Sequence, residues 1–115
     1  MDRGQRPSAS GIAVDLMARF SVHVGVGPTS ATDVDLQSPL LSDLNTRVVA
    51  PLVAEGQVRS LRGLNPIVEF NGRRMIVSIQ TLTSVRRTEL RRPVGDLSSY
   101  RDEIVRALDL LVGGL

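Results

Sequence analysis

Few residue types in this sequence can do chemistry. The chain has 115 residues, no cysteine and a single histidine, His23. Without cysteine, the sequence excludes thiol catalysis, disulfides, iron–sulfur clusters and cysteine-ligated zinc. One histidine cannot supply a two-histidine metal site. Asp33 and Asp35 are spaced i, i+2 and would share one face of a strand. Such carboxylates can act in acid–base catalysis or hold a metal, but no third ligand accompanies them, so we expect no metal and no cofactor.

The other candidate groups do not combine into a catalytic set. We expect His23 on the polar face of a strand, as a surface residue and not a general base. Gly25 and Gly27 are not followed by the lysine-bearing helix of a phosphate-binding loop. Pairs of arginines could clamp phosphate, as in a ribonuclease, yet no base accompanies them. The residue types alone therefore predict a non-enzymatic binding protein.

Positive charge is concentrated in one part of the chain. All 14 basic residues are arginine, against 12 acidic residues, and the net charge is +2. Residues 59–92 contain eight arginines but only two acids, Glu69 and Glu89. This excess is either a solvated basic face or a docking surface for an acidic partner.

Alternating residues predict the strands that would position these groups. Residues 19–26 alternate between apolar and polar side chains, which is the pattern of a strand with one buried face. Residues 33–37 and 47–53 are the next predicted strands, and Pro51 places the second of them at a sheet edge or a bulge. Between these strands, residues 40–44 are either a helical turn or a loop that packs two leucines inward.

The clearest local signal is a hairpin followed by less certain segments. Asn-Gly at residues 71–72 separates two strand-like runs, 67–70 and 73–80. It predicts a type I′ turn, because both turn positions need positive φ. Residues 82–85 are ambiguous, and residues 86–92 are expected to be an exposed connection.

The C-terminal segment has the pattern of an amphipathic helix. Ser99 followed by Asp102 approximates a capping box, and Gly113 with Gly114 is a natural stop. The apolar face consists of Ile104, Leu108, Leu111 and Leu115, widened by Val105 and Val112. The whole pattern predicts a mainly β protein: a small, barrel-like antiparallel sheet with one helix docked on it.

The domain is expected to begin at Met17. Residues 1–16 are polar and lack periodicity, so they are either a disordered N-terminal extension or a mis-annotated start, and residues 17–115 form the domain. The start is a poor signal peptide, and no run approaches the roughly 18 apolar residues that a membrane span needs. We expect a cytoplasmic protein.

Three stretches, taken together, resemble the CcdB family, the toxins of type II (CcdA/CcdB) toxin–antitoxin modules. They occur in the family's order and spacing, and they cover nearly all of residues 17–115. The stretches are DVDLQSPLL at 33–41 continuing through NTRVVAPL at 45–52, LNPIVEFNG at 64–72, and PVGDLSSYRDEIVRALDLL at 93–111.

The resemblance implies an SH3-like antiparallel β-barrel with a C-terminal helix, working as a homodimer. It implies binding to the A subunit of DNA gyrase and poisoning of that enzyme, with neutralisation by a CcdA-type antitoxin. It implies neither an enzyme activity nor sequence-specific DNA binding by the toxin alone. The antitoxin-binding candidates are Arg73, Arg74, Arg86 and Arg87, and the dimer-interface candidates are Leu108, Leu111, Val112 and Leu115.

The gyrase-binding positions depart from the family's pattern. Its best-known members end in Trp-Gly-Ile, and the matching residues here are Gly113, Gly114 and Leu115. Loss of a buried interface tryptophan typically costs roughly 2 kcal/mol or more. Two alternatives therefore stay open. One is a ribonuclease toxin of the MazF type, and the other is a degenerate toxin that only sequesters antitoxin.

Overall fold

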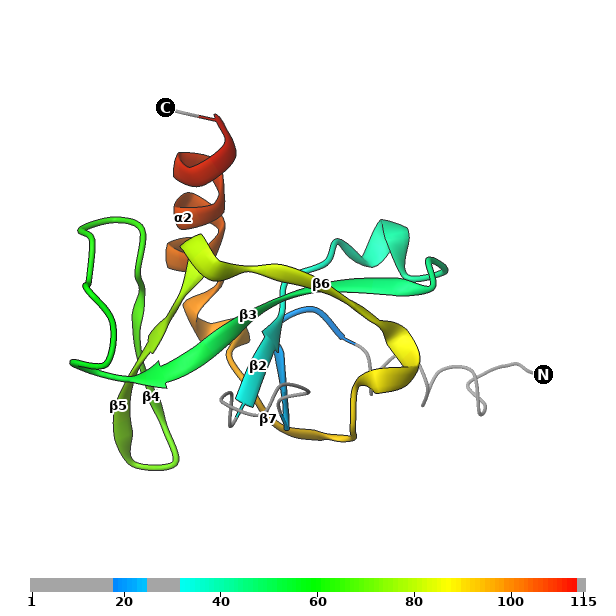
Figure 1. Cartoon of the computed structure of the whole chain (residues 1–115), viewed down its shortest axis with the longest axis horizontal. Helices are drawn as coiled ribbons and strands as arrows, with labels where there is room; N and C mark the ends of the chain where they lie inside the picture. Colours follow the sequence, from blue (N-terminus) through cyan, green and yellow to red (C-terminus); the bar gives the residue numbers. More distant parts are fainter. Residues whose placement is uncertain (1–17, 25–31, 114–115) are drawn as a thin grey trace.

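The fold is a seven-stranded antiparallel sheet curved into a half-barrel, with one helix at the C-terminal end (Figure 1). A computed structural model describes residues 18–24 and 32–113. The strands are β1 (Ser21–Val24), β2 (Thr32–Asp35), β3 (Thr46–Ala54), β4 (Ile67–Phe70), β5 (Arg73–Val77), β6 (Thr83–Arg86) and β7 (Pro93–Asp96). Their spatial order is β4-β5-β3-β2-β1-β7, with β6 also paired to β3. This confirms the predicted fold class. The predictions for residues 1–17 and for 25–26 lie outside the described residues.

The long strand β3 organises the sheet. One of its edges pairs with β2, while the other pairs first with β6 (from Thr46 to Val49) and then with β5 (from Leu52 to Ala54). The prediction that Pro51 marks a sheet edge or a bulge is wrong. Pro51 lies between the two partners, where its carbonyl accepts a hydrogen bond from the Ser78 N–H (2.9 Å). Its missing N–H falls in this gap, so no ladder hydrogen bond is lost.

The structure confirms the hairpin and resolves the ambiguous segments. Asn71 and Gly72 both have positive φ, 52° and 75°, as a type I′ turn requires. β5 ends at Val77, earlier than predicted, because residues 79–81 form a 3-10 turn. Residues 83–86 form strand β6, and β7, which the sequence did not predict, pairs with β1.

Side chains close the barrel where the backbone leaves it open. The end strands β4 and β7 meet through Phe70 and Gly95: a Cβ at Gly95 would lie 2.4 Å from the Phe70 ring. The Glu69 N–H, at the outer edge of β4, donates to the Tyr100 hydroxyl (3.0 Å). These contacts cover an edge that would otherwise present unpaired backbone groups.

Helix α2 (Arg101–Gly113) packs its buried residues, Ile104 and Ala107, against the sheet. The core that it meets is aliphatic and includes Val22, Val34, Ala50, Leu52, Val77 and Ile79. The predicted capping box is wrong, because Ser99 lies inside a 3-10 turn (Ser98–Tyr100) that leads into the helix. In Figure 1 the last turn of α2 projects away from the strands.

Candidate functional site

Asp35, the second of the two aspartates of β2, forms a buried ion pair. Arg47, from β3, donates from Nε (3.1 Å) and Nη2 (2.7 Å) to Asp35 Oδ2. The two side chains are 1% and 0% exposed. Burial raises the pKa of Asp35, although the Gln37 N–H and the Arg47 guanidinium act in the opposite direction. With its acceptor capacity used in this way, Asp35 is not available as a general base.

Gln37 connects this buried ion pair to the turn that follows β2. Its backbone N–H donates to Asp35 Oδ1 (3.0 Å). Its side-chain amide donates to the Leu41 carbonyl (2.8 Å) and accepts from the Val48 N–H (3.1 Å). The ion pair and Gln37 therefore fix the turn against the start of β3.

His23 is buried, so its prediction as a surface residue is wrong. The side chain is 0% exposed, and its Nδ1 lies within hydrogen-bond distance of the Arg91 carbonyl. Its Nε2 has no hydrogen-bond partner among the residues that the structure describes. Ser21 and His23 are buried as well as Val22, so β1 is covered on both faces and not on one. Other segments of the chain cover the polar face of β1. The alternation of residues along one strand cannot predict this cover.

The described part of the chain contains no catalytic constellation. Within residues 18–24 and 32–113, no group of three histidine or acidic side chains could hold a metal. His23 faces Asp33 across the β1–β2 register, but both are buried, at 0% and 4% exposure. A buried pair of this kind offers no accessible acid or base to a substrate.

The four candidate arginines form two separate pairs. Arg73 and Arg74 lie at the β4–β5 turn, and Arg74 makes an exposed ion pair with Glu55 (3.0 Å). The second pair, Arg86 and Arg87, lies where β6 meets the first residue of β3. Because β5 meets the last residues of β3, the two pairs lie toward opposite ends of that strand, whose length along the backbone is roughly 27 Å at about 3.4 Å per residue.

The leucines between β2 and β3 point outward. Of the two alternatives predicted for residues 40–44, the helical turn is observed, whereas the loop that packs two leucines inward is wrong, because Leu40 is 93% exposed and Leu41 is 50% exposed. Leu44 is also exposed. The segment is a 3-10 turn (Pro39–Leu41), whose start is capped by the Ser38 hydroxyl. Sequence reasoning missed this surface because it assigned apolar residues to the interior by default.

The end of helix α2 is another exposed apolar surface. Leu108 packs partly against the core. Leu110, Leu111 and Val112 are 40%, 38% and 79% exposed. At Gly113, the last described residue, a Cβ would meet none of the other described residues within 4 Å. Gly114 and Leu115 lie outside the described residues.

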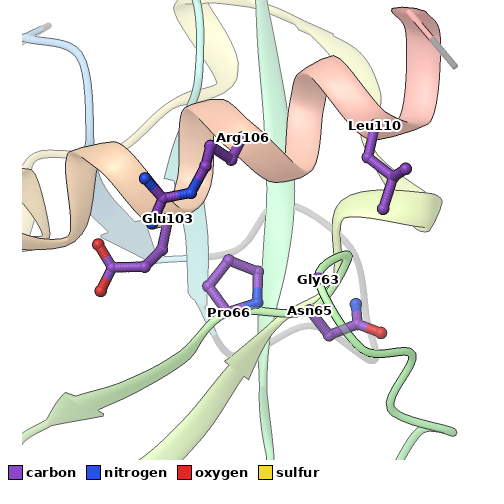
Figure 2. Close-up of a pocket in the computed structure, with 6 residues that line it drawn as sticks. All are labelled: Gly63, Asn65, Pro66, Glu103, Arg106 and Leu110. Carbon is purple, nitrogen blue, oxygen red and sulfur yellow. The ribbon is translucent and has the colours of Figure 1, made fainter. Parts of the chain in front are cut away.

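A groove separates α2 from the loop before β4 (Figure 2). It has a volume of about 360 Å³ and is lined by Gly63, Asn65, Pro66, Glu103, Arg106 and Leu110. Two hydrogen bonds hold the Asn65 side chain in place in this groove: it accepts from the Leu61 N–H (2.8 Å) and donates to the Val77 carbonyl (3.2 Å). No sequence motif marks this groove, because it forms where a helix meets a distant loop.

Comparison with known proteins identifies the family. The model of the CcdB family, described as CcdB protein, matches residues 19–114. The chain belongs to the CcdB family. It is therefore a toxin of this family, and membership implies an antitoxin partner. None of the curated proteins compared with it matches. No helix in the described ranges is long and apolar enough to cross a membrane.

Solved structures share the fold. One, described as Mycobacterium tuberculosis toxin MazF-mt6, has a TM-score of 0.64 and 20% identity, over 77% of this chain and 92% of that one. Another, described as an Mtb toxin, has a TM-score of 0.61 and 19% identity, over 76% of this chain and 94% of that one. At these identities the likeness concerns the fold alone.

Proposed function

We propose that this CcdB-family toxin acts by binding the A subunit of DNA gyrase and inhibiting the enzyme. The observation that carries the proposal is the exposed apolar end of α2, within a family match that reaches residue 114. An exposed cluster of aliphatic side chains at a helix end is a surface suited to protein binding. The gyrase contact is assigned to this end, with Gly113, Gly114 and Leu115 as its last residues.

The absence of the family's tryptophan at Gly113 sets the expected strength of gyrase binding. Because Gly113 has no side chain, the gyrase contact would be made by the aliphatic residues before it. We therefore expect weaker binding to gyrase than in family members that have the tryptophan. A Cβ at Gly113 would meet no described residue within 4 Å, so we expect the fold to accept a tryptophan at this position.

The same proposal assigns the remaining partners. A CcdA-type antitoxin would meet the arginine pairs Arg73–Arg74 and Arg86–Arg87, and a segment that contacts both must extend along β3. A second copy of the chain would meet the apolar face of α2 that includes Leu108, Leu111, Val112 and Leu115. Leu108 already packs partly on the core, and Leu111 and Val112 also belong to the helix end that is assigned to gyrase, so the contact between copies and the contact with gyrase would adjoin at this end. The protein would act in the cytoplasm, without enzyme activity of its own.

The functional test is expression of the full chain in bacteria without an antitoxin. A gyrase poison halts growth and leaves double-strand breaks in DNA. A ribonuclease toxin of the MazF type also halts growth, but it cleaves RNA and leaves the chromosome intact. A degenerate toxin that only sequesters antitoxin leaves growth normal. Normal growth together with unaffected DNA supercoiling would contradict the gyrase assignment.

A further inference from the structure

The connection from β6 to β7, residues 86–92, is rich in arginine, and we call it the arginine loop. It contains four arginines and a single acid, Glu89, whose carboxylate accepts from the Arg86 N–H (2.9 Å). Arg86, Arg91 and Arg92 are exposed, and within the described part of the chain their side chains form no ion pair. Three exposed guanidinium groups on one short connection concentrate positive potential in one place.

The arginine loop is held in place near both of its ends. The backbone N–H of Arg87, the fourth arginine, donates to the Asn45 carbonyl (2.7 Å), and its Nη1 donates to the Ser42 carbonyl (3.0 Å). The Arg91 carbonyl lies within hydrogen-bond distance of Nδ1 of the buried His23. A backbone that is fixed in this way loses little conformational entropy when a ligand binds to its side chains.

The composition of the arginine loop favours a phosphate backbone as its ligand. Apart from arginine, its exposed residues are Thr88 and Glu89, so it has no exposed apolar side chain that could anchor a protein partner. Guanidinium groups match phosphate oxygens in geometry and charge. Arg86 and Arg92 are six residues apart, which is at most about 20 Å of chain. A DNA duplex of that length carries about twelve phosphate charges.

The aromatic residues of this chain favour a duplex over a single strand. Proteins bind single-stranded nucleic acids largely by stacking bases on aromatic side chains. The chain has two phenylalanines, one tyrosine and no tryptophan. Phe20 is 3% exposed, and Phe70 packs against Gly95. The Tyr100 hydroxyl accepts from the Glu69 N–H. All three aromatic side chains are therefore engaged within the fold, and none belongs to the arginine loop.

We propose that the arginine loop binds the phosphate backbone of double-stranded DNA without reading its sequence. Arg86, Arg91 and Arg92 supply three phosphate contacts. The choice of DNA over an RNA duplex rests on the proposed function, because gyrase presents a DNA duplex to a protein that is bound to it. Arg86 also belongs to a pair that is assigned to the antitoxin, so the antitoxin and DNA should compete for it.

The test is fluorescence anisotropy of a short labelled DNA duplex, titrated with the full chain at several salt concentrations. Three phosphate contacts predict a slope of about −2.7 for the logarithm of the binding constant against the logarithm of the salt concentration, at about −0.9 per contact. The double variant Arg91→Gln/Arg92→Gln keeps one contact, so its slope should be about −0.9 and its binding at low salt should be at least about tenfold weaker.

The double variant Arg59→Gln/Arg62→Gln is the matched control, because it removes the same charge from two exposed arginines before β4. In Figure 1 the segment between β3 and β4 (green) and the arginine loop (yellow) lie at opposite sides of the molecule. We expect this variant to bind DNA with the affinity and the salt dependence of the wild type.

Three results would overturn the proposal. Equal weakening in the two double variants would show that net charge alone, and not the arginine loop, attracts DNA. Tighter binding of a polyglutamate peptide than of DNA, lost in Arg91→Gln/Arg92→Gln, would make the loop a site for an acidic protein. The third is a wild type that does not bind the duplex at low salt.

A supercoiling assay with purified gyrase separates this proposal from the proposed function. Inhibition of gyrase without DNA binding by the free chain would refute the DNA contact and leave the gyrase assignment intact. DNA binding through the arginine loop without inhibition of gyrase would support the contact and contradict the gyrase assignment alone.

Discussion

Removing one partner of the buried ion pair between Asp35 and Arg47 should destabilise the fold strongly, whereas replacing both side chains together should change its stability little. Both side chains are inaccessible to water, and Arg47 places two N–H groups on one carboxylate oxygen, at 3.1 and 2.7 Å. Asp35 also accepts from the Gln37 N–H. The informative variants are Asp35→Asn, which keeps that acceptor, Arg47→Met, which keeps the aliphatic bulk, and the double variant.

The magnitudes follow from burial. Asp35→Asn removes the carboxylate that Arg47 contacts, and Arg47→Met leaves the Asp35 carboxylate buried without that guanidinium; breaking a buried pair in this way costs about 3–5 kcal/mol. At roughly 4 °C per kcal/mol for a domain of this size, the midpoint of thermal unfolding should fall by about 12–20 °C. The double variant removes both charges and their desolvation cost together. We expect its stability to lie within about 1–2 kcal/mol of the wild type.

The stability of the Arg47→Met variant should also depend on pH differently from that of the wild type. Burial already raises the pKa of Asp35, and Arg47 opposes that rise. Arg47→Met removes the opposing charge, so the folded-state pKa rises further above the unfolded value. The stability contributed by this carboxyl is then fully present below the unfolded pKa and is lost as the pH rises through the folded pKa. Arg47→Met should therefore be less destabilising at pH 4 than at pH 7.

Urea unfolding of all four proteins at both pH values measures these effects as a double-mutant cycle. Additive losses in the single and double variants would show that the two side chains do not interact. A pH-independent loss in Arg47→Met would contradict the account of Asp35. Either result would refute the reasoning from the buried contact.

Three further predictions concern the closure of the barrel and the surface. Gly95→Ala places a methyl group 2.4 Å from the Phe70 ring, so it should destabilise the fold by about 1–3 kcal/mol in urea unfolding, and unchanged stability would show that the ring moves freely. Tyr100→Phe removes the acceptor of the Glu69 N–H and should cost about 1 kcal/mol, with faster amide exchange at Glu69; unchanged exchange would contradict this. Glu55→Gln breaks only the exposed ion pair with Arg74, so the thermal midpoint should not change, and a clear decrease would show that the pair is structural.

Local patterns in the sequence predicted the elements whose signals are themselves local. The Asn71–Gly72 turn followed from positive φ at both positions, and both are observed. The helix followed from its apolar stripe, of which Ile104 is fully buried. Strand β7 escaped prediction because Pro93 and Gly95 are poor strand formers. Strand β7 forms because it pairs with the edge of β1, and because Gly95, which has no side chain, leaves room for the Phe70 ring.

Features that depend on register or on coverage by distant segments escaped prediction. Asp35 and Arg47 are twelve residues apart and meet only because β2 and β3 pair in one particular register. His23 is buried because its carbonyl partner, Arg91, comes from a segment 68 residues away. The outward direction of Leu40 could not be read from its apolar character, which normally indicates burial.

The most direct test of the gyrase assignment is a supercoiling and cleavage assay with purified gyrase, the full chain and its Gly113→Trp variant. The account predicts that the wild type traps cleaved DNA, and that the variant does so at a lower concentration because the added aromatic residue supplies an interface anchor. If neither protein inhibits supercoiling or traps cleaved DNA at concentrations at which both are folded, gyrase is not the target.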